Sequence, residues 1–176
     1  MKVDHLGGVQ ISYRSPHKDE RGIFRRVAEL EDFENISSAV SIKQVSYSSN
    51  DLALTLRGLH AMNLELNEYK IVSCVTGTLL DVVVDVREES PTFLDYMQIV
   101  LNSSEGKSVI IPPGFAHGYL TLAPNTSLIY CMTASYSKNE EIGFRWDDDA
   151  IGIDWGIDFP NSISKRDLGF SLINDR

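Results

Sequence analysis

The feature that most constrains the fold is a series of short, β-branched apolar runs separated by polar turns. Such runs cover residues 69–75, 79–86, 96–101, 108–111, 118–122 and 127–132, and residues 40–47 alternate apolar with polar side chains. Short strands at regular spacing, with little helical periodicity, are typical of antiparallel sandwiches and barrels. We therefore predict one all-β domain over residues 1–176, a double-sheet jelly roll whose mouth would form a ligand pocket.

Local signals add detail to this prediction. The Thr76-Gly77 turn between 69–75 and 79–86 predicts a hairpin that leads into a central strand. A short helix is expected near 29–34. The acidic C-terminal region from Asp147 onward is interrupted by glycines and a proline, which predicts loops with a helical turn.

Composition excludes several function classes. The chain has 16 Lys and Arg against 25 Asp and Glu, a net charge of −9, so it lacks the basic surface that nucleic-acid binding needs. No stretch approaches the roughly 18 apolar residues that span a membrane. The two cysteines, Cys74 and Cys131, lie in apolar runs, as buried, reduced thiols do. We expect a cytoplasmic protein that binds neither nucleic acid nor membrane.

The first candidate for chemistry is His60, in the segment LRGLH at 56–60. Arg57 precedes it by three residues and Lys70 follows it by ten. Gly58 allows the backbone to bend or another chain to approach closely. A single imidazole among cations favours proton transfer beside an anionic substrate.

The second candidate is His117, in the motif Pro-x-Gly-x-x-His, which matches the second metal-ligand motif of cupin barrels. The first cupin motif has His-x-His, and Met62 stands where its second histidine would be. A metal held by His60, His117 and either Glu65 or Glu68 would therefore need an unusual ligand set. We predict no metal, and keep a metal-dependent cupin enzyme as an alternative.

Tyrosines and arginines complete the candidate set. Tyr130 and Tyr136 flank a strand expected to line the barrel, and a phenol beside a histidine is a suitable proton donor at neutral pH. Several arginines in one pocket would form a diphosphate clamp, because the guanidinium fork matches phosphate oxygens. The candidates are Arg21, Arg25, Arg26 and Arg57.

Together these pieces resemble the dTDP-4-dehydrorhamnose 3,5-epimerase family, in order along nearly the whole chain. A single short motif is weak evidence for a family, but the whole set of motifs in this order is specific. The matching segments are 19–24 (DERGIF), Gln44 with Ser48, 56–60 (LRGLH), 70–75 (KIVSCV), Gly77, 81–87 (DVVVDVR), 90–93 (SPTF), 111–118 (IPPGFAHG), Tyr130, Tyr136, Trp146 with Asp148, 151–155 (IGIDW) and 164–167 (SKRD).

The resemblance implies a cupin-like jelly roll with short helices, a homodimer, and epimerisation without a cofactor. The implied substrate is a nucleotide-diphosphate 4-keto-6-deoxysugar, whose C4 carbonyl acidifies the C–H bonds at C3 and C5. Carried over by position, His60 would be the base and Asp167 would hold its other ring nitrogen. Lys70 would stabilise the enolate. Tyr136 would return a proton on the opposite face.

The resemblance also implies which residues contact the substrate. Arg57 would lie beside the sugar diphosphate, and Arg21 would contact the diphosphate, often from the partner subunit. His117 would lie near His60 in a supporting role. The remaining expected contacts are Phe24, Arg26, Gln44, Ser46 and Tyr130.

Four positions depart from the family pattern, namely Ala61 and Met62 after the histidine, Arg26, and Ser46. They surround the sugar and nucleotide, so they leave open which substrate is used and whether C3, C5 or both are epimerised. Two further alternatives stay open, a sugar 3,4-ketoisomerase and a non-catalytic barrel that binds nucleotide sugars.

Overall fold

A computed structural model describes residues 1–29 and 41–175, which are almost entirely strands and turns. The elements are β1 (Gln10–Tyr13), β2 (His17–Asp19), β3 (Gly22–Phe24), β4 (Gln44–Asn50), β5 (Leu56–Met62), η1 (Leu64–Leu66), β6 (Lys70–Thr76), β7 (Thr78–Asp85), β8 (Tyr96–Asn102), β9 (Lys107–Ile111), β10 (Phe115–Thr121), β11 (Thr126–Met132), η2 (Lys138–Glu140), β12 (Glu141–Gly143), α2 (Lys165–Leu168) and η3 (Ile173–Asp175).

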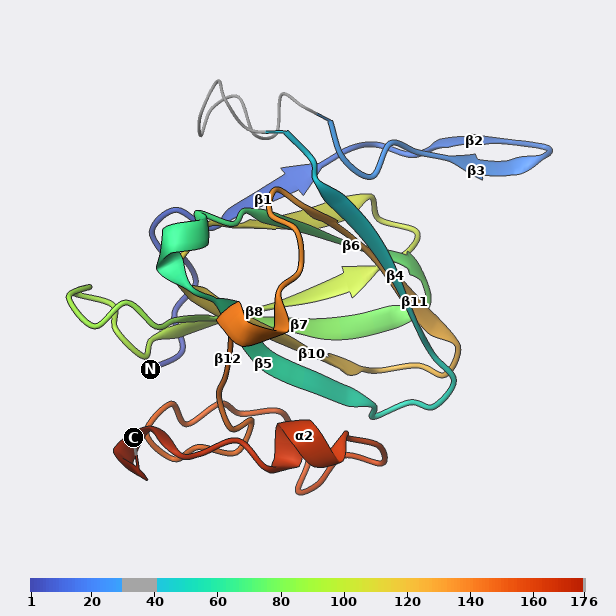
Figure 1. The fold of residues 1–176 in the computed structure, drawn as a ribbon. Coiled ribbons are helices and arrows are strands. Elements are labelled where there is room, and N and C mark those ends of the chain that lie inside the picture. Colours follow the sequence, from blue (N-terminus) through green and yellow to red (C-terminus); the bar gives the residue numbers. More distant parts are fainter. Residues whose placement is uncertain (30–40, 176) are drawn as a thin grey trace.

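Two five-stranded antiparallel sheets face each other (Figure 1). The β4 sheet has the order β1-β9-β6-β11-β4, and the β5 sheet has the order β12-β5-β10-β7-β8. From β4 to β12 the chain passes repeatedly from one sheet to the other. This double-sheet arrangement confirms the predicted cupin-like jelly roll.

The predicted hairpin between 69–75 and 79–86 is wrong. β6 pairs with β9 and β11, whereas β7 pairs with β8 and β10 in the other sheet. The Thr76-Gly77 turn is therefore a corner between sheets. Side chains from both strands, such as Val72 and Leu79, meet across the barrel interior, and this burial would be lost if the strands lay side by side.

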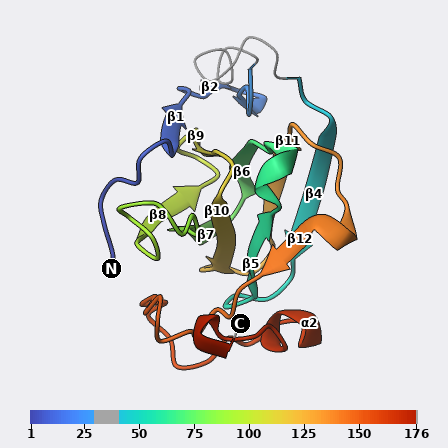
Figure 2. The same cartoon turned by 60° about the vertical axis from the view of Figure 1, so that its left-hand side comes forward.

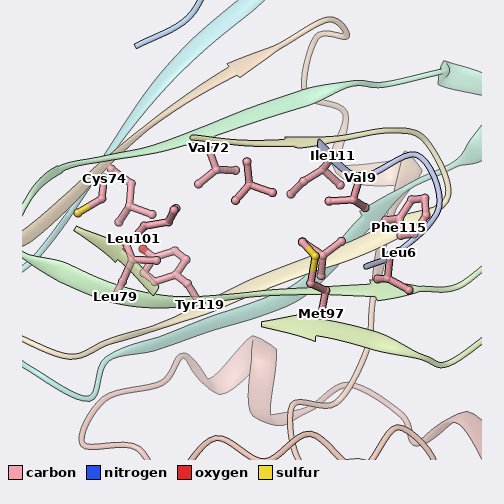
Figure 3. Packing of buried hydrophobic residues seen from close by; sticks show 13 residues of the cluster. Leu6, Val9, Val72, Cys74, Leu79, Met97, Leu101, Ile111, Phe115 and Tyr119 are labelled. Carbon is pink, nitrogen blue, oxygen red and sulfur yellow. The ribbon is translucent and has the colours of Figure 1, made fainter. Parts of the chain in front are cut away.

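Two apolar layers sandwich the β5 sheet. The inner layer fills the barrel between the sheets (Figure 3) and includes Val72, Leu79 and Tyr119. The C-terminal segment lies along the other face of the β5 sheet (Figure 2). The outer layer fills the space between them and includes Trp146 and Trp155. Burial on both faces explains why residues 79–84 of β7 are apolar except for Asp81, and the position of β7 between β10 and β8 confirms its prediction as a central strand.

The strand predicted at 40–47 begins at Gln44 and continues to Asn50. Its apolar side chains point outward: Val45 is 62% exposed and Tyr47 is 65% exposed. The inward face is the polar one, because it lines a pocket instead of the apolar core. Alternation thus predicted the strand correctly, but which face is buried depends on the tertiary structure.

The remaining predictions concern a helix, the C-terminal region, the cysteines and membrane spans. The helix expected near 29–34 lies outside the described residues except for Glu29, which is not helical. The C-terminal region is loops with the short helix α2, as predicted. Cys74 and Cys131 are buried free thiols, also as predicted. In the described part of the chain, no helix is long and apolar enough to cross a membrane.

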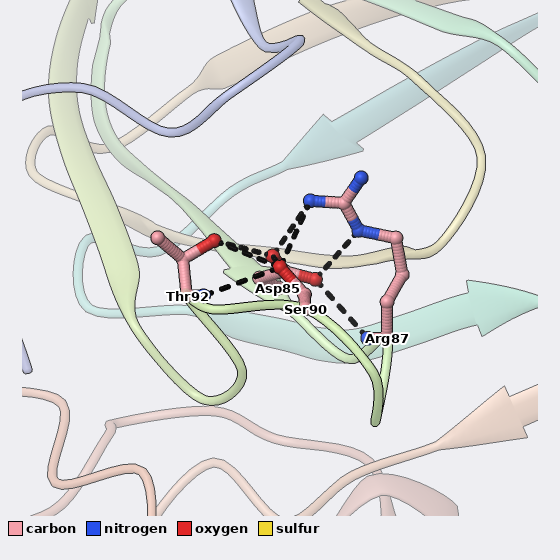
Figure 4. Close-up of polar contacts among 4 residues, drawn as sticks. All are labelled: Asp85, Arg87, Ser90 and Thr92. Carbon is pink, nitrogen blue, oxygen red and sulfur yellow. Dashed lines mark hydrogen bonds and ion pairs between the residues drawn. The ribbon is translucent and has the colours of Figure 1, made fainter.

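A buried carboxylate, Asp85, organises the loop between β7 and β8 (Figure 4). It binds Arg87 Nε and Nη2 at 2.8 and 2.7 Å, and accepts hydrogen bonds from the hydroxyls of Ser90 and Thr92, each at 2.6 Å. Burial by itself would raise the pKa of Asp85, but these hydrogen bonds outweigh it and lower that pKa well below its ordinary value.

Candidate active site

A pocket of about 460 Å³ opens between the two sheets. It collects side chains from β4, β5, β6, β10 and β11, and from the segment that precedes and begins β12. The structure thus brings together most of the residues predicted from the sequence. Those that line the pocket are Gln44, Ser46, Arg57, His60, Lys70, His117, Tyr130 and Tyr136.

A bulge in β5 lets two of these residues face the same pocket. Arg57 and His60 are three residues apart, so a regular strand would point them to opposite faces. Against β10, His60 lies opposite His117. Arg57 lies opposite Tyr119, which is two residues after His117 on β10. Three residues of β5 thus span two of β10, so β5 contains one extra residue. Gly58 makes this possible: its φ is +114°, and a β-carbon there would lie 2.7 Å from the His117 carbonyl oxygen.

The short helix α2 orients the His60 imidazole. His60 Nε2 lies 3.0 Å from Asp167 Oδ1, and the other carboxylate oxygen accepts the Gly58 amide at 3.1 Å. Because an ionised carboxylate only accepts, Nε2 carries the proton and Nδ1 keeps its lone pair. Ser164 caps α2 by accepting the Asp167 amide at 3.0 Å, which fixes this carboxylate's backbone. This arrangement would allow His60 to accept a proton at Nδ1.

The charge state of Asp167 supports this arrangement. Burial by itself would raise the pKa of Asp167. The hydrogen bond and charge of His60, together with the Gly58 amide, outweigh burial and lower that pKa. The carboxylate is therefore ionised at neutral pH and can stabilise an imidazolium at His60.

Glu141, the first residue of β12, lies on the pocket side of His60. One of its oxygens is 3.8 Å from His60 Nδ1, and the other accepts the Tyr136 hydroxyl at 2.9 Å. Arg166 forms an ion pair with the same carboxylate. Glu141 thus connects His60, a tyrosine at the pocket mouth and α2.

His117 has a carboxylate partner of its own deep in the barrel. Its Nε2 lies 2.7 Å from Asp81 Oδ1, and both side chains are buried. The ring of Tyr130, from the facing sheet, lies 6.1 Å away. Within residues 1–29 and 41–175, no three or more His, Cys, Asp or Glu side chains are grouped to hold a metal ion. His60 and His117 are each directed at a carboxylate instead.

Lys70 places an ammonium group on the β4-sheet side of the pocket. Its Nζ is 3.8 Å from the buried Glu68. Burial raises the pKa of Glu68, Lys70 partly opposes this, and nearby Glu141 adds to it. Lys70 is paired with Met132 in register, and Tyr130 is two residues from Met132 on the same strand face. Lys70 and Tyr130 are therefore diagonal neighbours inside the barrel.

The outer end of the pocket is polar. Gln44 Nε2 donates to Ser46 Oγ at 2.9 Å, and Gln44 Oε1 accepts the Tyr136 amide at 3.0 Å. Arg57 Nε donates to Asn50 Oδ1 at 2.9 Å, and Arg57 lines the same pocket as the polar residues of β4. A cation beside hydroxyl and amide groups can bind a ligand that contains phosphate and sugar groups.

Comparison with known proteins identifies the family. The model of the dTDP-4-dehydrorhamnose 3,5-epimerase family matches residues 4–175. The chain belongs to this family. It is 36% identical to the dTDP-4-dehydrorhamnose 3,5-epimerase of Salmonella typhimurium over 157 residues, 89% of this chain and 85% of that protein. It is 39% identical to that of Sinorhizobium fredii over 169 residues, 95% of this chain and 87% of that protein.

Solved structures support the same family assignment. The Bacillus anthracis dTDP-4-dehydrorhamnose 3,5-epimerase with TDP and PPi bound has a TM-score of 0.87 and 29% identity, covering 94% of both chains. A 3'-monoepimerase from Streptomyces bikiniensis in complex with dTDP-quinovose has a TM-score of 0.87 and 26% identity, covering 97% of this chain and 87% of that one. The protein is accordingly a carbohydrate epimerase, an isomerase.

Three predicted site residues of this epimerase lie away from the pocket of their own chain. Arg21 and Phe24 belong to the β2–β3 hairpin, which projects from the body of the barrel (Figure 1). Phe24 is 69% exposed, and Arg21 pairs with Asp19 at 2.5 Å within the hairpin. Arg26 follows the hairpin and pairs with Glu29 at 3.1 Å. The structure does not bring them to His60 within one chain.

Two carboxylates that contact the histidines of the candidate site were missed by sequence reasoning. Asp81 is an isolated carboxylate in an apolar run, and a charge in a buried strand requires a partner, so this signal was available. Glu141 carries no comparable signal. Its place beside His60 arises because β12 pairs with β5, a contact between segments far apart in sequence.

Proposed function

We propose that the protein epimerises a nucleotide-diphosphate 4-keto-6-deoxysugar at C3, C5 or both, through an enolate and without a cofactor. The observation that carries this proposal is the His60–Asp167 dyad, which leaves the lone pair of His60 on Nδ1, together with a lysine in the same pocket. That combination is suited to abstracting a proton next to a carbonyl.

In the proposed reaction, His60 Nδ1 removes the proton from the carbon beside the C4 ketone, and Asp167 stabilises the imidazolium. Negative charge develops on the C4 oxygen, where the Lys70 ammonium is preorganised to stabilise it. A proton is then returned to the opposite face of the carbon, which inverts it. Positioned acid and base groups typically contribute about 10²- to 10⁴-fold each in rate.

We assign the returning proton to Tyr130 rather than to Tyr136, which resemblance by position suggested. The Tyr136 hydroxyl binds Glu141, whose other oxygen faces His60, so Tyr136 lies on the same side as the base. Tyr130 projects from the facing sheet. Burial, followed by neighbouring Tyr119, raises the pKa of Tyr130, which keeps its proton in place until the enolate forms.

The two tyrosines can be separated by experiment. Tyr130→Phe should slow formation of inverted product about 100-fold, while His60 still exchanges the substrate proton with solvent. Tyr136→Phe should mainly raise KM. Deuterium uptake into recovered substrate and product formation, both followed by NMR in D₂O, provide the two readouts. If only Tyr136→Phe uncouples exchange from inversion, Tyr136 is the acid.

The substrate-contacting group would comprise Arg57 for the diphosphate and sugar, Gln44 and Ser46 on β4, and His117 beside the base. Support comes from the related structures that hold TDP with PPi or dTDP-quinovose. The decisive experiment incubates the protein with a panel of nucleotide 4-keto-deoxysugars in D₂O. Exchange at C3 or C5 of one member identifies the substrate; absence of exchange throughout the panel would refute the proposal.

A monoepimerase among the related structures makes reaction at a single carbon a specific second candidate. The same D₂O experiment distinguishes the two, because one or two deuterons are incorporated per molecule. A sugar 3,4-ketoisomerase would instead yield a ketone at C3. The proposed cytoplasmic location is supported by the two buried free thiols.

We further propose a homodimer in which the β2–β3 hairpin of each protomer supplies Arg21 to the pocket of its partner. Support comes from the projecting hairpin and from the exposed apolar side chains Val45 and Tyr47 on β4. Light scattering should give about twice the 19.7 kDa chain mass.

Complementation tests the shared site directly. Arg21→Ala and His60→Asn homodimers should each be impaired at low substrate concentration. Mixed and re-equilibrated, they should regain about a quarter of wild-type activity, because each heterodimer contains one site with both residues intact. If Arg21 served its own chain, no heterodimer site would be intact and mixing would restore nothing.

A further inference from the structure

Phe170, two residues beyond α2, contacts the proposed base directly. Its ring centroid is 5.8 Å from that of His60, and the ring planes meet at 87°. This edge-to-face geometry is the favourable one for aromatic pairs. Phe170 is three residues from Asp167, so one short segment delivers both the hydrogen-bond partner and an aromatic contact to the same imidazole.

The space that Phe170 occupies exists because residue 143 is glycine. Gly143 lies opposite His60 in the β12–β5 register. A β-carbon at this position would overlap the edge of the Phe170 ring. The ring therefore fills the place of the side chain that would otherwise be the cross-strand neighbour of His60.

Phe170 is itself held in place from the outside. The guanidinium of Arg166 lies 5.6 Å from its ring centroid, and Arg166 also pairs with Glu141. The half-buried phenyl ring thus contacts β12, α2 and the imidazole. A hydrogen bond at Nε2 alone would leave the imidazole able to tilt about that contact, whereas an adjacent packed ring restricts the tilt.

We propose that Phe170 is a positioning residue for the base: packed over Gly143, it holds the His60 ring so that Nδ1 points into the pocket. This rests on the proposed function of His60. It predicts a defect in the chemical step without a defect in substrate binding, since Phe170 does not line the pocket.

The first test is kinetic. Phe170→Ala should lower kcat about tenfold with KM within about twofold of wild type. Phe170→Leu, which retains bulk and protects folding, should show a smaller loss in the same direction. Phe159→Ala is the matched control: Phe159 forms a similar edge-to-face pair with Trp146, at 5.7 Å and 84°, away from the pocket. It should leave kcat unchanged. Unchanged kcat in both Phe170 variants would overturn the proposal.

The second test uses the steric fit. Gly143→Ala should displace Phe170 and lower kcat as Phe170→Ala does. The double variant should be no worse than either single variant, because the overlap is removed. Losses that multiply would show that the two residues act independently, contrary to the proposal.

The third test needs no turnover. Nitrogen-15 NMR of the four histidines, with His60 assigned through His60→Asn, should show altered or broadened His60 ring signals in Phe170→Ala but not in Phe159→Ala. If the wild-type protein exchanges no proton on any sugar, the proposed function is refuted. The NMR measurement still tests whether Phe170 positions the His60 ring, because it needs no substrate. Unchanged His60 signals would refute the positioning role.

Discussion

Replacing His60 with asparagine will reduce solvent deuterium uptake at the carbon beside the ketone about 10³- to 10⁴-fold. Asparagine preserves much of the side-chain volume and can still meet Asp167, but it has no basic lone pair at neutral pH. Without the base no enolate forms, so exchange and inversion are lost together. NMR of a 4-keto nucleotide sugar in D₂O measures both.

Two further variants test whether the loss of activity is specific to the His60–Asp167 pair. Asp167→Asn should retain the fold but lower the rate about 100-fold or more, because the amide can neither enforce the Nε2-protonated tautomer nor stabilise the imidazolium. His5→Asn, at an exposed position near the N-terminus, is the control and should have wild-type activity. Undiminished exchange in His60→Asn would remove His60 from the mechanism.

The second large effect concerns stability. Asp85→Asn should lower the free energy of unfolding by about 2–4 kcal/mol, because a buried carboxylate with several charge-assisted hydrogen bonds is replaced by a neutral amide. The loop from β7 to β8 depends on this group. Urea denaturation at constant protein concentration, monitored by tryptophan fluorescence, provides the measurement.

The chain offers a matched control in Asp147, which binds Arg145 at 2.7 Å with the same two-residue spacing but at the surface. Asp147→Asn should cost less than about 1 kcal/mol, since exposed ion pairs contribute little. Equal losses in the two variants would show that burial of the Asp85 network is irrelevant to its contribution.

The pH dependence follows from the lowered pKa of Asp85. Because the folded-state pKa lies below the unfolded value of about 4, the stabilisation is fully present above that value. It should be lost as pH falls from about 4 toward the lower folded-state pKa. The difference in unfolding free energy between wild type and Asp85→Asn should therefore shrink under strongly acidic conditions; a constant difference would contradict the prediction.

Much of the candidate active site was predictable because residue types limit the chemistry that a pocket can perform. His60, Lys70 and Arg57 stand out as an imidazole between cations, and Asp167 follows from resemblance in the 164–167 segment. The assignment of Tyr136 as the acid could not be judged from sequence, since Tyr130 and Tyr136 flank one strand. Which phenol faces the base depends on how two sheets enclose the pocket.

The strands, like the candidate site, were only partly predictable from the sequence. Alternating and continuous apolar runs report local burial, so β4 and β6 to β11 were predicted, with errors of up to about four residues at their ends. The short strands β1, β2, β3 and β12, and the strand β5 that carries His60, were not among the predicted runs. Strand partners were not predictable, because Thr76-Gly77 is compatible with either a hairpin or a corner between sheets. Only the burial of Val72 and Leu79 against each other's sheet decides between them.

The sequence by itself therefore determined a β-rich chain, its turns, and the set of side chains able to move a proton beside a ketone. The tertiary structure alone decided how that set is assembled. It places His60 and Asp167 together across 107 residues, turns Arg57 and His60 to one face through the Gly58 bulge, and seats Phe170 over Gly143. The physical reason is that apolar patterning encodes burial locally, whereas these contacts depend on long-range strand pairing and packing.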